Sequence, residues 1–335
     1  QEQNGSVNIS YQLNPVNKGY PKDLKTGNTE ADPTFNSDKL NSSPDNTSDT
    51  HSTIQPSKRR SLKSILNNRK ARQTKNNHET QSEYQNQNQI LDSSYNNHER
   101  NFVPILVYHH ILHDEENSFG ENIFIVSAEN FKQQMKFLKD NNYTTITLNQ
   151  LENYIKGNTE LPKKSVLITF DDGYKSNYVY AYPVMKEYSL HGVIFVVSGW
   201  IKSRYHAFNP SIFQILEQSE IDSSRDIFEY ASHTHNLHYL NNENESALLA
   251  SSDDIISEDL LKSKDLLKTT SIAYPYGKYS DKTIEIVEKL GFTMGFTVNN
   301  GNVKPGDDIY QLKRRVIYRN TTLEQFKKIV DMESQ

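Results

Sequence analysis

From Phe102 onward, the sequence alternates between short runs rich in β-branched and aromatic residues and longer segments with apolar residues at helical spacing. The short runs predict strands at 103–108, 144–147, 166–170, 192–197, 227–231, 272–274, 293–298 and 311–318. Helices are predicted between them, at 148–156, 178–188, 257–268 and 323–332, and after the capping residues Ser127 and Ser280. Because strands that alternate with crossover helices form a largely parallel sheet, the pattern predicts an α/β domain whose sheet closes into a barrel.

Residues 1–100 differ in composition from the rest of the chain. They contain 19 hydrophobic residues, whereas the whole chain is 34% hydrophobic. Such a segment cannot bury enough apolar surface to offset the entropy of ordering it, so we predict a disordered tail or tether before one domain at 101–335. Residues 58–72 of the tail carry seven basic side chains and no acidic one. This tract is expected to stay solvated, the alternative being contact with an anionic cell surface or membrane.

Charge, cysteine content and the first residues limit the function and the compartment. The tail has 13 Lys and Arg against 11 Asp and Glu, which is a net charge of +2. Since the whole chain has a net charge of −5, the net charge of the domain is −7. An acidic domain is a poor partner for nucleic acid. The absence of cysteine excludes a thiol nucleophile and a Cys-ligated zinc, and it fits an exported bacterial protein as well as many cytosolic ones. Because the sequence opens with Gln1 rather than Met, we expect that a signal peptide or membrane anchor was removed, or that the boundary is artificial, and we predict an extracellular or cell-surface protein.

Two adjacent carboxylates, Asp171 and Asp172, follow the predicted strand at 166–170 directly, and Gly173 comes next. Buried like charges repel each other and are poorly solvated, so this pair indicates a metal ion or a proton-transfer task. Gly173 permits a sharp bend, which would let both side chains reach one site although neighbours in a regular strand point to opposite faces. The simpler alternative is a helix N-cap aspartate with a solvated neighbour.

Three histidines and a proline also lie at or soon after the ends of other predicted strands, namely His109, His233, His238 and Pro275. In a parallel barrel the functional groups lie at the carboxyl ends of the strands, so these residues are expected near the two aspartates. Two histidines and one aspartate form a three-ligand site with open positions, which is the arrangement that a catalytic divalent metal needs. His235 is an alternative ligand, although a loop histidine that bonds to nearby backbone is the simpler interpretation.

Residues 198–225 show little periodicity and contain the only tryptophan of the chain, Trp200. We predict that this segment is an insertion over the mouth of the barrel. Trp200 is expected to pack against the protein, and a platform for a sugar ring is the alternative interpretation.

Three motifs occur in order along the chain: Thr-Phe-Asp-Asp-Gly at 169–173, Ser-His-Thr-His-Asn-Leu-His at 232–238, and Ala-Tyr-Pro-Tyr-Gly at 273–277. Together they resemble the successive motifs of the polysaccharide deacetylases, carbohydrate esterase family 4 or the NodB homology domain, over roughly residues 102–330. The spacing of His233 and His238, and Val-Tyr-His at 107–109, resemble the subgroup that deacetylates poly-β-1,6-N-acetylglucosamine in biofilm matrices.

The resemblance implies a distorted (β/α)7 barrel and a set of residue roles. Asp172, His233 and His238 would bind a divalent metal, usually Zn²⁺. Asp171 would be the general base. The backbone N–H of Tyr276 would help to hold the oxyanion, and Pro275 and Tyr276 would contact the substrate.

Two departures from the family pattern narrow the resemblance. Many members have an arginine that orients the general base at the position where this chain has Ala273. Many members also have a histidine late in the barrel that acts as the general acid. The late strand here reads Leu-Lys-Arg-Arg at 312–315 and has no histidine. Both departures favour the biofilm subgroup, in which the histidine of the first strand, here His109, resembles the acid.

The predicted function is therefore hydrolytic N-deacetylation of an extracellular N-acetylglucosamine polymer, with release of acetate, by a monomer that has no nucleic-acid partner. One alternative is a deacetylase of peptidoglycan or of another exopolysaccharide. Two others belong to different classes: an inactive barrel that only binds glycan, and a surface factor that binds polyanions through the basic tract.

Overall fold

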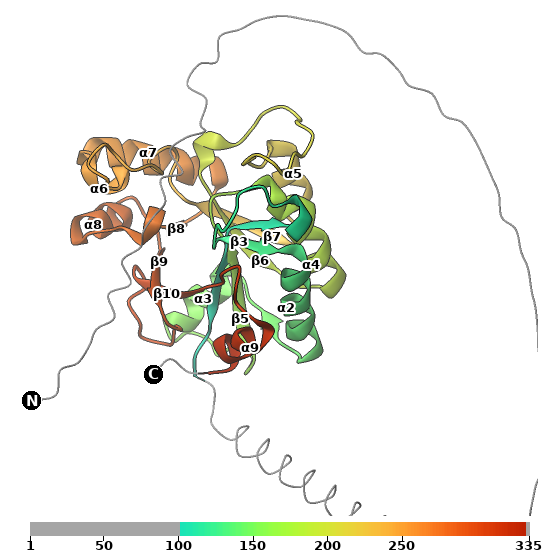
Figure 1. Cartoon of the computed structure of the whole chain (residues 1–335). Coiled ribbons are helices and arrows are strands. Elements are labelled where there is room, and N and C mark those ends of the chain that lie inside the picture. The colour runs from blue at the N-terminus through green and yellow to red at the C-terminus, as the bar shows by residue number, and fades with distance from the viewer. Residues whose placement is uncertain (1–100, 333–335) are drawn as a thin grey trace, which may run out of the picture. The chain divides into compact units, whose positions relative to one another are not determined.

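The computed structural model describes residues 101–332, so the predicted tail with its basic tract at 58–72 lies outside the described residues. Parallel strands form a closed ring (Figure 1), and in ring order they are β1 (Ile105–Tyr108), β5 (Ser165–Phe170), β6 (Gly192–Val196), β7 (Phe228–Ser232), β8 (Ser271–Ala273), β9 (Met294–Asn300) and β10 (Leu312–Val316). β1 closes the ring by pairing with both β5 and β10. The predicted (β/α)7 barrel is confirmed.

Three short strands lie outside the ring. β4 (Thr144–Thr145) pairs only with β5. It belongs to the connection between β1 and β5, which also contains α2 (Ala128–Asp140) and α3 (Leu148–Ile155). β2 (His110–Leu112) and β3 (Ile125–Ser127) form a separate parallel pair, which the sequence analysis missed. Only His109 separates β1 from β2, so periodicity alone gives little sign that one strand ends and another begins there.

The remaining helices cover the outside of the barrel. They are α4 (Tyr182–Tyr188), α5 (Gln218–Ser223), α6 (Ala247–Ala250), α7 (Asp253–Leu267), α8 (Asp281–Lys289) and α9 (Leu323–Asp331), with a π-helical turn at Asn177–Ala181 and 3₁₀ turns at Asp114–Glu116, Ser198–Trp200 and Pro275–Gly277. α2 and α4 cover one side of the barrel, and α6, α7 and α8 gather on another (Figure 1). Within residues 101–332, no helix is both long enough and apolar enough to span a membrane.

Helix starts follow the predicted chemistry at the capping residues, but other starts differ. Ser127 accepts a hydrogen bond from the N–H of Asn130, and Thr322 forms the predicted capping box with Gln325. α7, however, begins four residues before the predicted start at 257. Its first turn is acidic, which suits the positive end of a helix dipole but contributes no apolar periodicity.

Side chains along the barrel strands alternate between two buried layers. One apolar cluster takes residues from every strand of the ring and includes Ile105, Leu167, Val193, Ala231, Ala273, Met294 and Leu312. The neighbouring residues, such as Leu106 and Ile168, belong to a second cluster with α2 and α4. Continuing the first set toward the carboxyl ends of the strands leads to His109, Asp171, His233 and Arg314. The strand pattern therefore brings four polar residues to one end of the barrel interior.

Candidate active site

Asp171 forms a bidentate ion pair with Arg314, which comes from β10. Nη1 and Nη2 of the guanidinium donate to Oδ1 and Oδ2 of Asp171, each at 2.8 Å, and both side chains are buried. Nε of Arg314 donates to the carbonyl oxygen of Thr297 at 2.7 Å. Burial alone would raise the pKa of the Asp171 carboxyl, but the charge of Arg314 and its hydrogen bonds outweigh that effect and hold the pKa below its usual value. Asp171 is therefore ionised and fixed in orientation.

Arg314 lies outside the three motifs, and the run at 312–315 enters the resemblance only through its lack of a histidine. Leu312 is buried, Lys313 is exposed and Arg314 is buried. Period-two alternation from Leu312 was thus a usable signal, since it puts Arg314 on the inward face. This chain has no arginine at position 273, but Arg314 reaches Asp171 from another strand.

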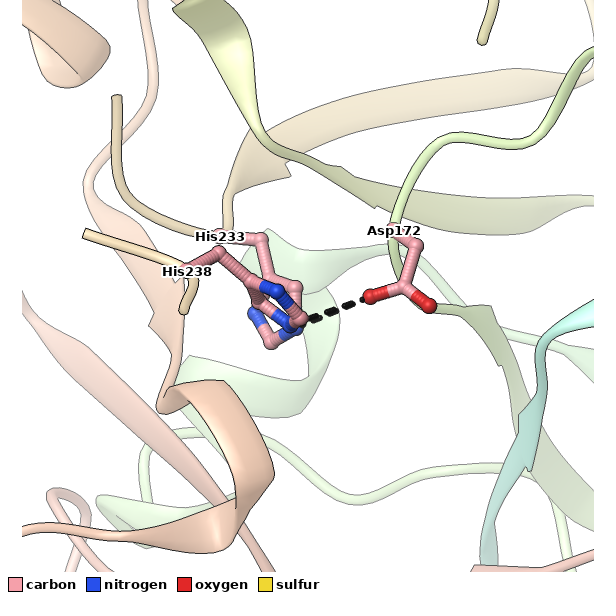
Figure 2. Close-up of side chains that lie close together, drawn as sticks. All are labelled: Asp172, His233 and His238. Carbon is pink, nitrogen blue, oxygen red and sulfur yellow. Dashed lines mark ion pairs between the residues drawn. The ribbon is translucent and has the colours of Figure 1, made fainter. Parts of the chain in front are cut away.

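Asp172 faces His233 and His238, the two histidines predicted to bind a metal with it (Figure 2). Its Oδ1 atom is 3.5 Å from Nε2 of His233 and 3.2 Å from Nε2 of His238. The three candidate ligand atoms all lie within 4.8 Å of one another. Atoms bound tetrahedrally to zinc at about 2.0–2.1 Å are roughly 3.4 Å apart. The three residues therefore fit a metal ion of this kind.

The charges at this group of residues suit a cation. Burial would raise the pKa of the Asp172 carboxyl, but the charge of His238 outweighs that effect and holds the pKa well below its usual value. Burial, and then the charge of His238, lower the pKa of His233 to about 4. At neutral pH the group thus offers a carboxylate and a neutral imidazole, which are the protonation states that metal binding requires.

The backbone at Asp172 has an unusual conformation. Asp172 itself has φ 72°, and Gly173 follows with φ 76°, so the bend begins at Asp172, one residue before the glycine at which the sequence predicts it. A Cβ atom on Gly173 would lie 2.9 Å from Cγ1 of Val196, which leaves no room for a side chain. Aspartate tolerates the left-handed region better than most residues, but the conformation is still unfavourable. It is the bend that turns Asp172 from the alternation of β5 toward the histidines.

The two histidines are held by different contacts. Nδ1 of His233 lies 2.8 Å from the carbonyl oxygen of Ala273, a contact that places the proton on Nδ1 and leaves the lone pair on Nε2. His238 is held by aromatic rings instead. Its ring lies 4.7 Å from that of Tyr276 and 5.4 Å, edge to face, from that of Trp200. Trp200 thus packs against the protein, as predicted, and its position next to His238 keeps it close to the site.

His235 is turned away from the other two histidines of its loop. Its Nδ1 atom lies 2.9 Å from Oγ of Ser198. The N–H groups of His235 and Asn236 donate to the carboxylate of Asp259, at 2.7 and 2.6 Å. The geometry agrees with the interpretation of His235 as a loop histidine. Asp259, on α7, fixes the loop between His233 and His238, and no motif in the sequence indicated this role.

His109 and His110 occupy different environments, as alternation along β1 predicts. His109 is half-buried, its charge acts on both Asp171 and Asp172, and its Nδ1 atom has no hydrogen-bond partner among residues 101–332. His110 is buried, with Nδ1 2.5 Å from Oγ of Ser176 and its ring stacked on Tyr174. Burial lowers the pKa of His110 to about 4, although the charge of Asp172 opposes the shift.

Pro275 and Tyr276 form a tight turn after β8. Pro275 is buried, whereas Tyr276 is half-buried and has a left-handed φ of 56°. Gly277 follows with φ 65°, and a Cβ atom there would lie 2.2 Å from Cγ2 of Val298. The turn brings Tyr276 against His238, so the residue predicted to hold the oxyanion is next to a candidate metal ligand.

Comparison with known proteins gives consistent matches. The family model for polysaccharide deacetylase matches residues 158–295. The chain is 32% identical over 201 residues to the poly-beta-1,6-N-acetyl-D-glucosamine N-deacetylase of Staphylococcus aureus, covering 58% of this chain and 68% of that protein. The fold matches IcaB from Ammonifex degensii with a TM-score of 0.60 and 26% identity, covering 69% of this chain and 98% of that one. It matches the Streptococcus pyogenes deacetylase PplD, solved with acetate, with a TM-score of 0.59 and 27% identity, covering 68% and 98%.

The chain belongs to the polysaccharide deacetylase family. It is a polysaccharide N-deacetylase, a hydrolase that removes acetyl groups from amide nitrogen. The expectation drawn from its three motifs is confirmed, and the interpretation as an inactive glycan-binding barrel is wrong.

Proposed function

We propose that this chain is a metal-dependent enzyme that removes acetyl groups from poly-β-1,6-N-acetyl-D-glucosamine outside the cell. One juxtaposition carries the proposal: Asp171, ion-paired to Arg314, directly precedes Asp172, which lies among His233 and His238. A base and a three-residue metal site are thus side by side. Hydrolysis of an acetamide needs both, because the amide carbonyl is a poor electrophile and the amine a poor leaving group.

Asp172, His233 and His238 would hold the metal, and their nitrogen and oxygen donors suit Zn²⁺. When bound, such an ion lowers the pKa of a water molecule toward about 7 and polarises the acetyl carbonyl group. Ala273 and Asp259 support this set through the backbone contacts described above, so the ligands are fixed before a metal arrives.

Asp171 is the general base of the proposed reaction. It takes a proton from the attacking water as the bond to the acetyl carbon forms. Arg314 keeps the carboxylate ionised and holds both oxygens in one plane, and each oxygen retains a further lone pair for the incoming proton. The backbone N–H of Tyr276 donates to the oxygen that becomes negative in the tetrahedral intermediate.

His109 is the general acid. It donates a proton to the amide nitrogen as the carbon–nitrogen bond breaks, which releases glucosamine and acetate. Support comes from its position at the end of β1, where its charge acts on both aspartates, and from the free Nδ1 atom within the described residues. That atom is buried, and no contact within the described residues uses its hydrogen-bonding capacity.

The choice of polymer is supported by the Staphylococcus aureus relative, whose name gives poly-β-1,6-N-acetyl-D-glucosamine as its substrate. A matrix polymer is met outside the cell, so a secreted or cell-surface location belongs to the same proposal. We also propose that the enzyme acts as a monomer.

Acetate release from a panel of purified N-acetylated polymers tests the proposal. We expect the fastest release from poly-β-1,6-N-acetylglucosamine, loss of release with a chelator, and recovery when Zn²⁺ is added back. Faster release from peptidoglycan would reassign the substrate and leave the chemistry intact. Full activity in the presence of chelator would contradict the metal site itself.

A further inference from the structure

The segment between β6 and α5 connects the two loops that supply the candidate metal ligands. At its start, the N–H groups of Ser198 and Gly199 donate to the carbonyl oxygens of Thr234 and His235, at 3.1 and 2.8 Å. At its end, the N–H of Leu216 donates to the carbonyl oxygen of Gly173 at 2.9 Å. The segment therefore spans the site from the histidine loop to the aspartate loop, at the carboxyl end of the barrel.

A buried ion cluster anchors this segment to the aspartate loop. Nζ of Lys175 lies 2.5 Å from Oε1 of Glu217 and 2.8 Å from Oε1 of Glu220, and the side chains of all three are at most 9% exposed. The same Glu217 oxygen accepts from the N–H of His206 at 2.5 Å. Because Lys175 is three residues after Asp172, their Cα atoms are at most about 11 Å apart.

Tyr205 projects from this anchored segment into solvent. Its side chain is the most exposed of the large apolar groups in residues 101–332, at 78%. One face of its ring lies over Nζ of Lys175, with 5.2 Å from the nitrogen to the ring centroid. The neighbouring N–H groups of Lys202 and His206 are hydrogen-bonded to Leu216 and Glu217. One face of the ring is thus held by a cation–π contact, and the rest of the ring is exposed to solvent.

Resting on the proposed function, we propose that Tyr205 is a binding platform for a sugar ring that neighbours the reactive residue of the glycan. A polymer that reaches the site must continue past it on at least one side. A fixed aromatic face beside the aspartate loop offers a flat apolar surface to the C–H face of the next sugar, at little entropic cost because the ring is already held. A single exposed tyrosine is ordinary in itself, but this one is anchored through the loop that carries Asp172.

The test compares kcat/KM for acetate release from a short and a long β-1,6-linked N-acetylglucosamine oligomer. For Tyr205→Ala we expect a loss on the order of 10-fold with the long oligomer, mainly through KM, and a change within about twofold with the shortest one turned over. Tyr205→Phe keeps the ring and should behave like the unsubstituted protein. Ile255→Ala, which removes a 53% exposed side chain from α7, is the matched control and should change neither value.

Equal losses with both oligomers, or no loss with either, would overturn the platform, provided that the unsubstituted protein releases acetate normally. Absence of release from every oligomer by the unsubstituted protein would overturn the proposed function and the platform with it. Melting temperatures of the variants complete the test, because a folding defect lowers activity on both oligomers together and so counts against the platform.

Discussion

The strands of the barrel and the loops that follow them contribute to the site in different ways. His109, Asp171, His233 and Arg314 continue the inward alternation of regular strands, and the last three are buried. The loops instead supply Asp172, His238 and Tyr276. Left-handed backbone occurs at Asp172, at Tyr276, and at Thr234 in the histidine loop.

This difference separates the proposed tasks. Strand residues provide the base, its arginine partner and the acid, whose groups must be fixed in orientation toward the reacting atoms. Loop residues complete the metal set, where several side chains must converge on one point that no single strand can reach. His233 belongs to both groups, because it ends the alternation of β7 and opens the histidine loop.

The largest effects are expected at the histidine loop. We expect His233→Ala and His238→Ala to abolish acetate release and to lower metal content, because each leaves only two ligands. His235→Ala is the control within the same loop, since its imidazole contacts Ser198, and it should keep the metal. Metal content by elemental analysis checks both expectations. Equal metal loss in the His235 variant would mean that the loop has been misassigned.

The next effect separates two adjacent residues. We expect His109→Ala to retain metal and to lower kcat by on the order of 10²-fold or more, as for a missing general acid. The loss should be smaller for an activated aryl acetate, whose leaving group needs no proton. His110→Ala is the matched control, and it should act through packing against Tyr174 and lower the melting temperature. Normal turnover by His109→Ala with a defect in His110→Ala would reverse the assignment.

Substitutions of Arg314 test how a strand residue outside the three motifs contributes to turnover and to stability. Arg314→Lys keeps the charge but loses the bidentate geometry, so we expect kcat to fall on the order of 10- to 100-fold with metal content unchanged. Arg314→Met should destabilise the fold by about 3–5 kcal/mol, because it leaves Asp171 buried and unpaired.

Combining Arg314→Met with Asp171→Asn gives the control for that prediction. Removing the charge of Asp171 should restore much of the lost stability, which urea unfolding would measure as a coupling between the two substitutions. Simple additivity would show that the ion pair does not govern stability at this point.

The smallest effect is expected outside the barrel. A chain that begins at Asn101 should retain its turnover on soluble oligosaccharides, because residues 1–100 contain few apolar residues and none of the three motifs. Acetate release by the two forms, measured side by side, checks this. Loss of activity in a shortened chain that still melts cooperatively would contradict the predicted domain boundary.

Much of this arrangement could be predicted from the sequence, because strand composition and the polar residues after each strand are local signals. The position of Arg314 depended on knowing where β10 begins, since a run of three basic residues otherwise resembles a solvated segment. The left-handed backbone at Asp172 has no local signal beyond the tolerance of aspartate for it. Asp259 contacts residues 23 and 24 positions away along the chain, and periodicity cannot report such a contact.

The most direct test of the central claim uses the two neighbouring carboxylates, because Asp171 belongs to the strand residues and Asp172 to the loop residues. Asp171→Asn and Asp172→Asn remove the same charge from adjacent positions with almost no change in volume. Metal content and acetate release should be measured on the same preparations. We expect both variants to be inactive, with Asp171→Asn retaining the metal and Asp172→Asn losing it. Equal metal content in the two variants, or substantial acetate release by either one, would contradict the division between a strand-borne base and a loop-borne ligand.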